Sequence, residues 1–320
     1  MLRCTLSTTS FCRPVFKAFQ NKVVGREGQD FFFYVNFRFG MKTKVCVNHL
    51  YKYSSEWGGV LYAWFLSMHT RVDLMFCGRQ GEAALLQAAV AVCDVLARLE
   101  KMANYYDPAS ELACLNRTAA CAPQPVSDEL CDMLAFCLSC YDRTEGCFDV
   151  TVSSDAYVPG VTIHQVRLMQ HERVLSFNRE GVSINLSGFL KGYALESVRQ
   201  VLRQHRIVDA LVNMGNSSVL ALGHAPQAEG WRIGFGQSGY GGPEVLLCDE
   251  CLTTSGNDSL QRKHIMNPHT GQLVEGKRQV AVITSDGGSG EVLSTALFVA
   301  DSSQRAVMEK EFSPRLIIDL

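Results

Sequence analysis

A phosphate-binding turn is predicted at residues 185–194, which read Asn-Leu-Ser-Gly-Phe-Leu-Lys-Gly-Tyr-Ala. The apolar run 181–186 predicts a strand, and apolar residues at helical spacing from Tyr193 to Leu202 predict a helix after it. Gly188 lets the backbone approach a ligand, the start of the helix offers free N–H groups, and Lys191 adds a positive charge in the first turn. Taken alone, the segment also fits an ordinary strand-turn-helix junction with a surface lysine.

Three further segments end in groups that donate hydrogen bonds to phosphate or ribose. They are a strand and turn at 210–216, a hydroxyl-rich loop at 253–256, and a polar turn at 264–271. A helix from Gly290 then carries an acidic residue and two hydroxyl residues three and four positions apart, and therefore on one face. Such hard oxygen ligands favour magnesium over zinc.

In this order, the segments make the chain resemble the ApbE-type FAD:protein FMN transferase family over residues 67–320. The matching motifs are Met68-His-Thr70, Tyr106–Asn116, Phe148–Val152, the turn at Lys191, Val212–Gly215, Thr254–Gly256, the turn at His264, and Leu293–Phe298. The resemblance implies an enzyme that binds FAD with Mg²⁺ on its pyrophosphate. It also implies that the FMN half of FAD is transferred to a Ser or Thr hydroxyl of a target protein, with release of AMP.

The resemblance assigns roles to individual residues as well. His264 would be the general base, since imidazole titrates near neutral pH, and Lys191 would face the phosphates or the flavin. Without the resemblance, His264 is better interpreted as a structural turn histidine. The implied magnesium ligands are the carbonyl of Gly188 and the side chains of Glu291, Ser294 and Thr295. The implied FAD-binding residues are Met68, Thr70, Tyr106, Ser110, Cys147, Phe148, Asp149, Asn185, Lys191, Asn213, Gly215, Thr254, Ser255 and Met266.

The chain departs from the family pattern close to this site. Asn185, Ser217 and Asn267 stand where the family usually has Asp, and Glu291 stands in place of the usual metal-binding Asp. The loss of negative charge reduces repulsion with FAD but is expected to lower metal affinity, which depends on ligand charge and geometry. Two alternatives to a transferase follow: a protein that binds FAD with weak or lost transfer activity, and an enzyme that hydrolyses FAD to FMN and AMP.

The rest of the sequence predicts an α+β fold with an antiparallel sheet and packed helices. Residues 82–104 have the apolar stripe of an amphipathic helix, and Ser127 followed by two acidic residues is typical of another helix start. Short strands are predicted at 210–214, 219–222, 231–235, 245–247, 280–284 and 315–319, with helices from Gly290 and Ser302 between them. The resemblance implies the ApbE-like, T-fold-related arrangement, with FAD in a cleft between two subregions.

Residues 67–320 are expected to form this domain, and residues 1–66 an N-terminal extension of unknown role. Within the extension, Phe31–Tyr34 has no clear period, so a short strand is its simplest interpretation. The first twenty residues lack the apolar core of a signal peptide, and no segment reaches the ~20 apolar residues of a membrane span. The sequence as written therefore predicts a cytoplasmic protein. If Met41 is the true start, an exported protein is the alternative.

Charge and cysteine content narrow the class of partner. A formal charge of −2 argues against nucleic acid, whose phosphates require a basic surface. Thirteen scattered cysteines indicate a reducing compartment. The pairs Cys137/Cys140 and Cys248/Cys251 have a spacing that can hold zinc, but Cys137 falls on the apolar face of its predicted helix, which favours burial. A zinc-stabilised interaction module is thus a minor alternative.

The resemblance also implies an acceptor protein. The family precedent is a subunit of a membrane redox pump, and the sequence does not identify the acceptor of this chain.

Overall fold

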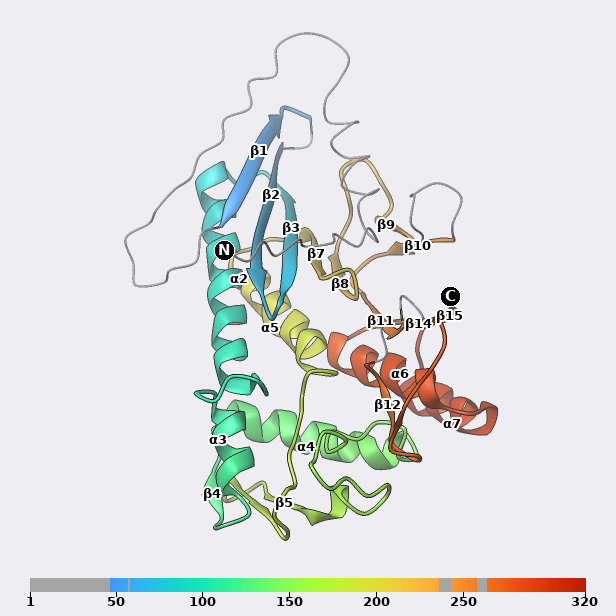
Figure 1. Cartoon of the computed structure of the whole chain (residues 1–320). Helices are drawn as coiled ribbons and strands as arrows, with labels where there is room; N and C mark the ends of the chain where they lie inside the picture. The colour runs from blue at the N-terminus through green and yellow to red at the C-terminus, as the bar shows by residue number, and fades with distance from the viewer. Residues whose placement is uncertain (1–46, 57, 236–242, 258–263) are drawn as a thin grey trace, which may run out of the picture.

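The computed structural model describes residues 47–56, 58–235, 243–257 and 264–320, and it confirms the predicted α+β fold (Figure 1). Eight strands form one antiparallel sheet in the order β1-β2-β3-β7-β8-β11-β14-β15. Their bounds are β1 Asn48–Ser54, β2 Gly58–Ser67, β3 Thr70–Gly78, β7 Asp209–Met214, β8 Ser218–Leu222, β11 Cys251–Asn257, β14 Arg278–Thr284 and β15 Leu316–Asp319. Phe31–Tyr34 and Met41 lie outside the described residues.

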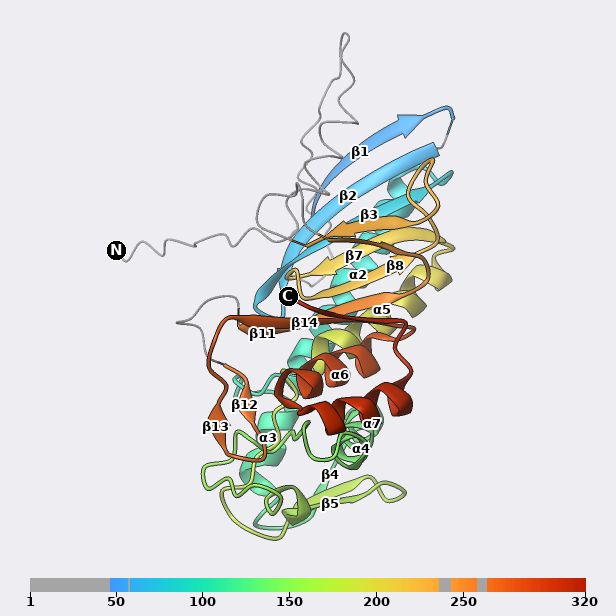
Figure 2. The same cartoon turned by 90° about the vertical axis from the view of Figure 1, so that its right-hand side faces the viewer.

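Helices cover one face of this sheet and extend beyond it into a smaller helical subregion (Figures 1 and 2). The helices are α2 Glu82–Ala103, α3 Glu111–Thr118, α4 Asp128–Arg143, α5 Leu190–Gln204, α6 Gly287–Val299 and α7 Ser302–Phe312, with a 3₁₀ turn at Ile163–Gln165. Among them, α2 packs on β2, α5 on β8, and α6 on β11 and β14. None of the helices in the described part of the chain is both long and apolar enough to cross a membrane.

Short hairpins complete the fold. Their strands are β4 Gln124–Pro125, β5 Val166–Met169 and β6 Val174–Phe177 in one small sheet, β9 Trp231–Gly234 with β10 Glu244–Leu247, and β12 Met266–Asn267 with β13 Gln272–Leu273. The β9–β10 pair covers the sheet face that the helices leave open. Along β3, Leu74 and Phe76 accordingly pack toward the helices, whereas Met75 and Cys77 pack with Trp231 of β9.

The region predicted as an extension contributes β1 and β2 to the main sheet. A two-residue turn joins β2 to β3, and its residues Met68 and His69 have φ values of 50° and 57°. Non-glycine residues rarely adopt this left-handed conformation. Glu100 of α2 braces the turn, because its Oε2 accepts hydrogen bonds from the Met68 N–H at 2.7 Å and the Ser67 hydroxyl at 3.1 Å.

The predicted strand at 181–186 is wrong. The segment is irregular, because its backbone pairs with side chains and with the loop at 150–155 instead of a neighbouring strand. The side chain of Asn116 accepts from the Ile184 N–H at 2.8 Å and donates to the Ile184 carbonyl at 2.9 Å, and the Ser183 N–H donates to Ser154 Oγ at 2.9 Å. These contacts hold the segment in place, although it is not a strand of the main sheet.

Other local predictions need smaller corrections. The stretch 253–256, expected as a loop, lies within β11, where it pairs with β14. Helix α6 begins at Gly287 instead of Gly290, because Asp286 accepts a capping hydrogen bond from the Ser289 N–H at 2.7 Å. Cys137 and Cys140 are buried in the core, as the apolar interpretation predicted.

A close helix crossing brings α5 against α6. A Cβ atom on Gly192 of α5 would lie 2.0 Å from the Gly287 carbonyl oxygen and 2.5 Å from Glu291 Cγ of α6. Only glycine fits at positions 192 and 287, where the two helices cross. Lys191 of α5 and Glu291 of α6 lie next to this crossing and are therefore held near one another.

Replacement Gly192→Ala is therefore expected to lower the free energy of unfolding by about 1–3 kcal/mol, because the clash involves backbone that cannot yield. Urea unfolding followed by circular dichroism measures this change. Gly234→Ala is the matched control, since a Cβ there meets only ordinary contacts at 3.8 Å and beyond. Equal stability of the two variants would contradict a tight crossing.

Candidate functional site

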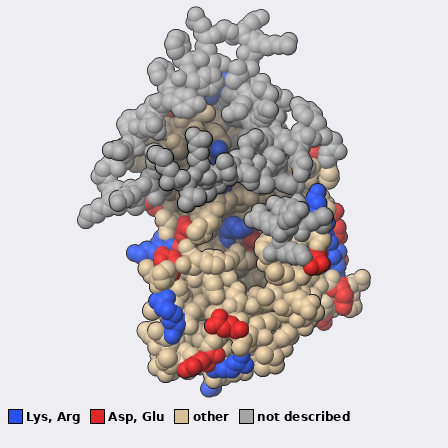
Figure 3. Space-filling model, in the orientation of Figure 1, with Lys and Arg blue, Asp and Glu red and all other residues tan. Residues whose placement is uncertain are grey.

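A cavity of about 510 Å³ lies between the sheet and the helical subregion, and Figure 3 shows a hollow on this face of the molecule. Its volume is in the range of small-molecule and cofactor sites. The predicted residues that line it are Tyr106, Cys147, Phe148, Asp149, Asn185, Gly188, Lys191, Gly215, Thr254, Ser255, His264, Met266, Glu291 and Thr295. Segments far apart in the sequence are thus assembled around one cavity.

Five predicted site residues lie outside the lining of this cavity, namely Met68, Thr70, Ser110, Asn213 and Ser294. Ser110 is fully buried as the N-cap of α3, where its Oγ accepts from the Ala113 N–H at 3.0 Å. Asn213 holds the turn after β7, since its Oδ1 accepts from the Asn216 N–H at 3.1 Å. Met68 belongs to the braced β2–β3 turn, and Thr70 packs directly against Gly215 of the lining. These residues support the cavity wall.

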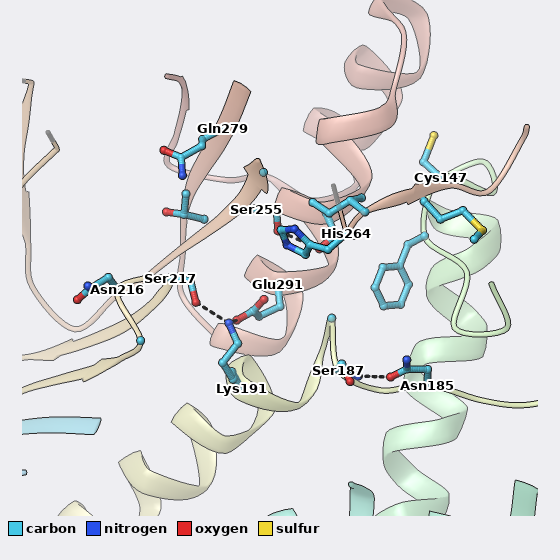
Figure 4. A pocket seen from close by; sticks show the side chains of 18 of the residues that line it. Cys147, Asn185, Ser187, Lys191, Asn216, Ser217, Ser255, His264, Gln279 and Glu291 are labelled. Carbon is cyan, nitrogen blue, oxygen red and sulfur yellow. Dashed lines mark hydrogen bonds and ion pairs between the residues drawn. The ribbon is translucent and has the colours of Figure 1, made fainter. Parts of the chain in front are cut away.

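An ion pair lies at the base of the cavity (Figure 4). Lys191 Nζ is 3.5 Å from Glu291 Oε1, and it donates to Ser217 Oγ at 2.5 Å and to Ser218 Oγ at 3.2 Å. Ser218 in turn donates to Glu291 Oε1. The Glu291 side chain is only 4% exposed, and that of Lys191 is 24% exposed. The buried carboxylate is thus neutralised by Lys191.

Two hydroxyl residues of α6 point to different places: Thr295 lines the cavity and Ser294 lies in the core. Ser255 of β11 lies within 2.9 Å of both Ser294 Oγ and Thr295 Oγ1. Ser294 is fully buried and its hydroxyl also donates to the Glu291 carbonyl at 3.2 Å, whereas Thr295 lines the cavity. Of the three predicted metal ligands on this helix, the structure presents Glu291 and Thr295 to the cavity.

His264 enters the cavity from the segment that leads into β12. It is exposed, and Figure 4 shows its ring beside Ser255 and above Glu291. The β12–β13 hairpin is tied to the opposite wall through Tyr157, whose hydroxyl is 2.9 Å from both Asp149 Oδ2 and the Pro268 carbonyl. Burial and the neighbouring Asp149 raise the pKa of Tyr157, so the phenol stays protonated as a donor.

Asp149 and Cys147 belong to the wall from the helical subregion. Asp149 Oδ1 accepts from the Thr151 N–H at 2.7 Å and from its hydroxyl at 2.6 Å, so this carboxylate is fully engaged in holding its loop. Cys147 lies 3.5 Å from His269 Nε2, and burial, with smaller contributions from Asp301 and Glu145, raises the pKa of its thiol to about 11. A protonated thiol is a poor nucleophile, and Cys147 therefore acts as an apolar lining group.

Asn185 and Asn267, at two of the positions where the resemblance implies Asp, make the backbone hydrogen bonds that an Asp would accept. Asn185 Oδ1 accepts from the Ser187 N–H and Asn267 Oδ1 accepts from the His269 N–H, each at 2.9 Å. The turns are therefore preserved without the charge. Ser217 differs, because it gives Lys191 a neutral partner.

Some lining residues were not predicted from the sequence. Gln279 and Leu320 meet at the sheet edge through paired backbone hydrogen bonds of 3.0 and 2.9 Å, and both line the cavity. Ser218 is fully buried and does not line the cavity, but it contacts both members of the ion pair and was also missed. None of these residues stands in a motif, so only the strand pairing reveals them.

The donors at the ion pair fit a magnesium ion that is shared with a ligand. Within the described residues, no cluster of three or more His, Cys, Asp or Glu side chains is placed to hold a metal. The cavity instead offers the carboxylate of Glu291, the hydroxyl of Thr295 and the backbone of Gly188. Magnesium is commonly bound by one or two carboxylates together with substrate phosphates, and this donor set matches that pattern.

Comparisons with known proteins agree on one family. The model of the ApbE family matches residues 68–315. An FAD:protein FMN transferase of Chlamydia pneumoniae is 24% identical over 241 residues, which cover 65% of this chain and 75% of the relative. Another, from Chlamydia trachomatis, is 23% identical over 256 residues, covering 70% and 79%. The structure of the flavin transferase ApbE from Vibrio cholerae has a TM-score of 0.70 at 21% identity, covering 82% of this chain and 92% of that chain. The last likeness establishes the fold.

Proposed function

Since the chain belongs to the ApbE family, we propose that it is an FAD:protein FMN transferase that moves FMN from FAD to a Ser or Thr hydroxyl of an acceptor protein and releases AMP. The observation that carries this proposal is the convergence of Lys191, Glu291 and His264 on one cavity of cofactor size. Phosphoryl transfer depends mainly on positioning and charge neutralisation, with a base for the incoming hydroxyl, and each requirement has a candidate residue here.

Each of these residues has its own role in the proposed reaction. The acceptor hydroxyl attacks the phosphorus on the FMN side of the pyrophosphate, an O–P bond forms, and the bond to the AMP phosphate breaks. His264 takes the hydroxyl proton, and Lys191 stabilises negative charge on the phosphates. Mg²⁺, held by Glu291, Thr295 and the Gly188 carbonyl, would supply further neutralisation across the pyrophosphate. Tyr106, Phe148 and Met266 offer apolar and aromatic surface for the flavin and adenine rings.

The test is incubation of the protein with FAD, Mg²⁺ and a membrane redox-pump subunit as the acceptor. Flavin fluorescence that stays on the acceptor band in a denaturing gel means transfer, and an acceptor whose target hydroxyl is removed is the control. Free FMN and AMP without labelling would mean hydrolysis, with water in place of the hydroxyl. Intact FAD that stays bound would mean a binding protein, in keeping with the neutral residues Asn185, Ser217 and Asn267.

Replacement Lys191→Ala is expected to weaken FAD binding by about 1.5–3 kcal/mol, because it removes a charge-assisted contact to phosphate. Among the described residues that line the cavity, Lys191 is the only Lys or Arg. Titration of flavin fluorescence in EDTA measures FAD affinity free of any metal effect. Lys310→Ala is the control, since Lys310 is exposed on α7. Unchanged affinity in Lys191→Ala would exclude a phosphate-binding role.

A further inference from the structure

We propose that Lys191 occupies the cation position at Glu291 when no FAD is bound, so that it gates the binding of a divalent cation. The cation then binds well only after the diphosphate of FAD has drawn the Lys191 ammonium away from Glu291. This inference rests on the proposed function for the identity of the ligand, and it adds a coupling between FAD and the metal that is carried by one side chain.

The ion pair provides the first argument. Lys191 Nζ lies 3.5 Å from Glu291 Oε1, and its other two partners are the uncharged hydroxyls of Ser217 and Ser218. Little water screens this attraction at the carboxylate, because the Glu291 side chain is 4% exposed. A divalent cation on the same carboxylate would lie within a few ångströms of the ammonium, and the like charges would repel.

Among the described residues, Glu291 is the anionic partner of Lys191. Among the described lining residues the side-chain carboxylates are those of Asp149 and Glu291, and both oxygens of Asp149 are engaged by Thr151 and Tyr157. Ser217 is neutral and lies 2.5 Å from the ammonium, so it holds the amine in place without competing for its charge. The diphosphate of FAD would bring a second charged partner for Lys191 into the cavity.

The backbone holds the two charged residues close together. Gly192 and Gly287 make the close crossing of α5 and α6, and a Cβ on Gly192 would also clash with Glu291 Cγ. The helices that carry the two charges are therefore in direct backbone contact at this crossing. Rotation of the Lys191 side chain, which is 24% exposed toward the cavity, is the available route to a free Glu291.

The gate makes a prediction with an unusual sign: removal of a positive charge should weaken FAD binding but strengthen metal binding in the absence of FAD. We use Mn²⁺ as the probe, since free Mn²⁺ is counted by its electron paramagnetic resonance signal. Purified full-length protein, stripped of FAD, is titrated as wild type, Lys191→Met, Lys191→Arg and the double variant Lys191→Met/Glu291→Gln. Thermal unfolding checks that each variant is folded.

Lys191→Met is expected to bind Mn²⁺ about tenfold more tightly than wild type without FAD, a coupling of ordinary size for linked sites. Lys191→Arg keeps the charge and should not show this gain. The double variant should lose it, because the gain acts through Glu291. Equal Mn²⁺ affinity of Lys191→Met and wild type would overturn the gate, and so would a gain that survives in the double variant or an absence of Mn²⁺ binding in every folded variant.

The result of the Mn²⁺ titration does not depend on the result of the acceptor-labelling test of the proposed function. The Mn²⁺ titration needs no acceptor and no transfer, so a gain in Lys191→Met supports the gate even if the wild type fails to label an acceptor. Conversely, labelling by the wild type with equal Mn²⁺ affinities refutes the gate and leaves the transferase proposal intact.

Discussion

Replacement Glu291→Gln is expected to lower the rate of FMN transfer by about 10²–10⁴-fold, because Glu291 has the one side-chain carboxylate among the described lining residues that is available to a metal. Glutamine keeps the size of the side chain and an oxygen that can accept from Ser218, so the crossing of α5 and α6 should remain intact. The measurement is the initial rate of acceptor labelling at saturating FAD over a range of Mg²⁺ concentrations.

The structure supplies two controls for this experiment. Glu309→Gln removes an exposed carboxylate from α7 and should leave the rate unchanged. Thr295→Ala should lower the rate through the same metal, whereas Ser294, fully buried and bonded to Ser255, acts on stability instead. Labelling by Glu291→Gln at the wild-type rate, or labelling by the wild type that persists in EDTA, would refute the metal role of Glu291.

Periodicity predicted most elements of the fold. The apolar stripe of 82–104 became α2 almost to the residue, and the short runs from 210 to 319 became strands β7, β8, β9, β10, β14 and β15. The predicted strand at 181–186 failed for a physical reason. One of its hydrogen-bond partners is the side chain of Asn116, 68 residues away from Ile184, and an apolar run gives no sign of which groups will satisfy its backbone.

The candidate site was predictable where residue type and local geometry coincide. Gly188 and Lys191 stand at a helix start, and that signal is local. Ser218 could not be found in this way, because its role depends on a partner 73 residues further along the chain. The close crossing at Gly192 and Gly287 is likewise a property of two helices, and it decides that Lys191 meets Glu291.

The three neutral residues at positions where Asp was expected differ in what they change. Asn185 and Asn267 each accept a backbone hydrogen bond, so they keep the shape of the cavity and change only its charge. Ser217 changes a contact of Lys191 itself. We therefore expect Ser217, more than the two asparagines, to alter how FAD and the metal share this cavity.

Replacement His264→Ala is expected to lower the rate of transfer by roughly 10²–10⁴-fold, the usual contribution of a general base, while FAD affinity changes little. His264 lines the cavity, and Figure 4 shows it on the side of Glu291 away from the Lys191 helix. The measurement is single-turnover labelling of the acceptor across a pH range. The wild-type rate should rise with pH as the imidazole loses its proton and becomes able to accept one from the hydroxyl.

The same experiment distinguishes a base from a binding residue. Loss of a base lowers the labelling rate at saturating FAD and removes the rise with pH, whereas loss of a binding contact raises the FAD concentration needed and leaves the rise in place. His269→Ala is the matched control, because His269 stands on the same hairpin but contacts Cys147 and Gln304. A His264→Ala protein that labels at the wild-type rate with the same pH profile would mean that another group takes the proton.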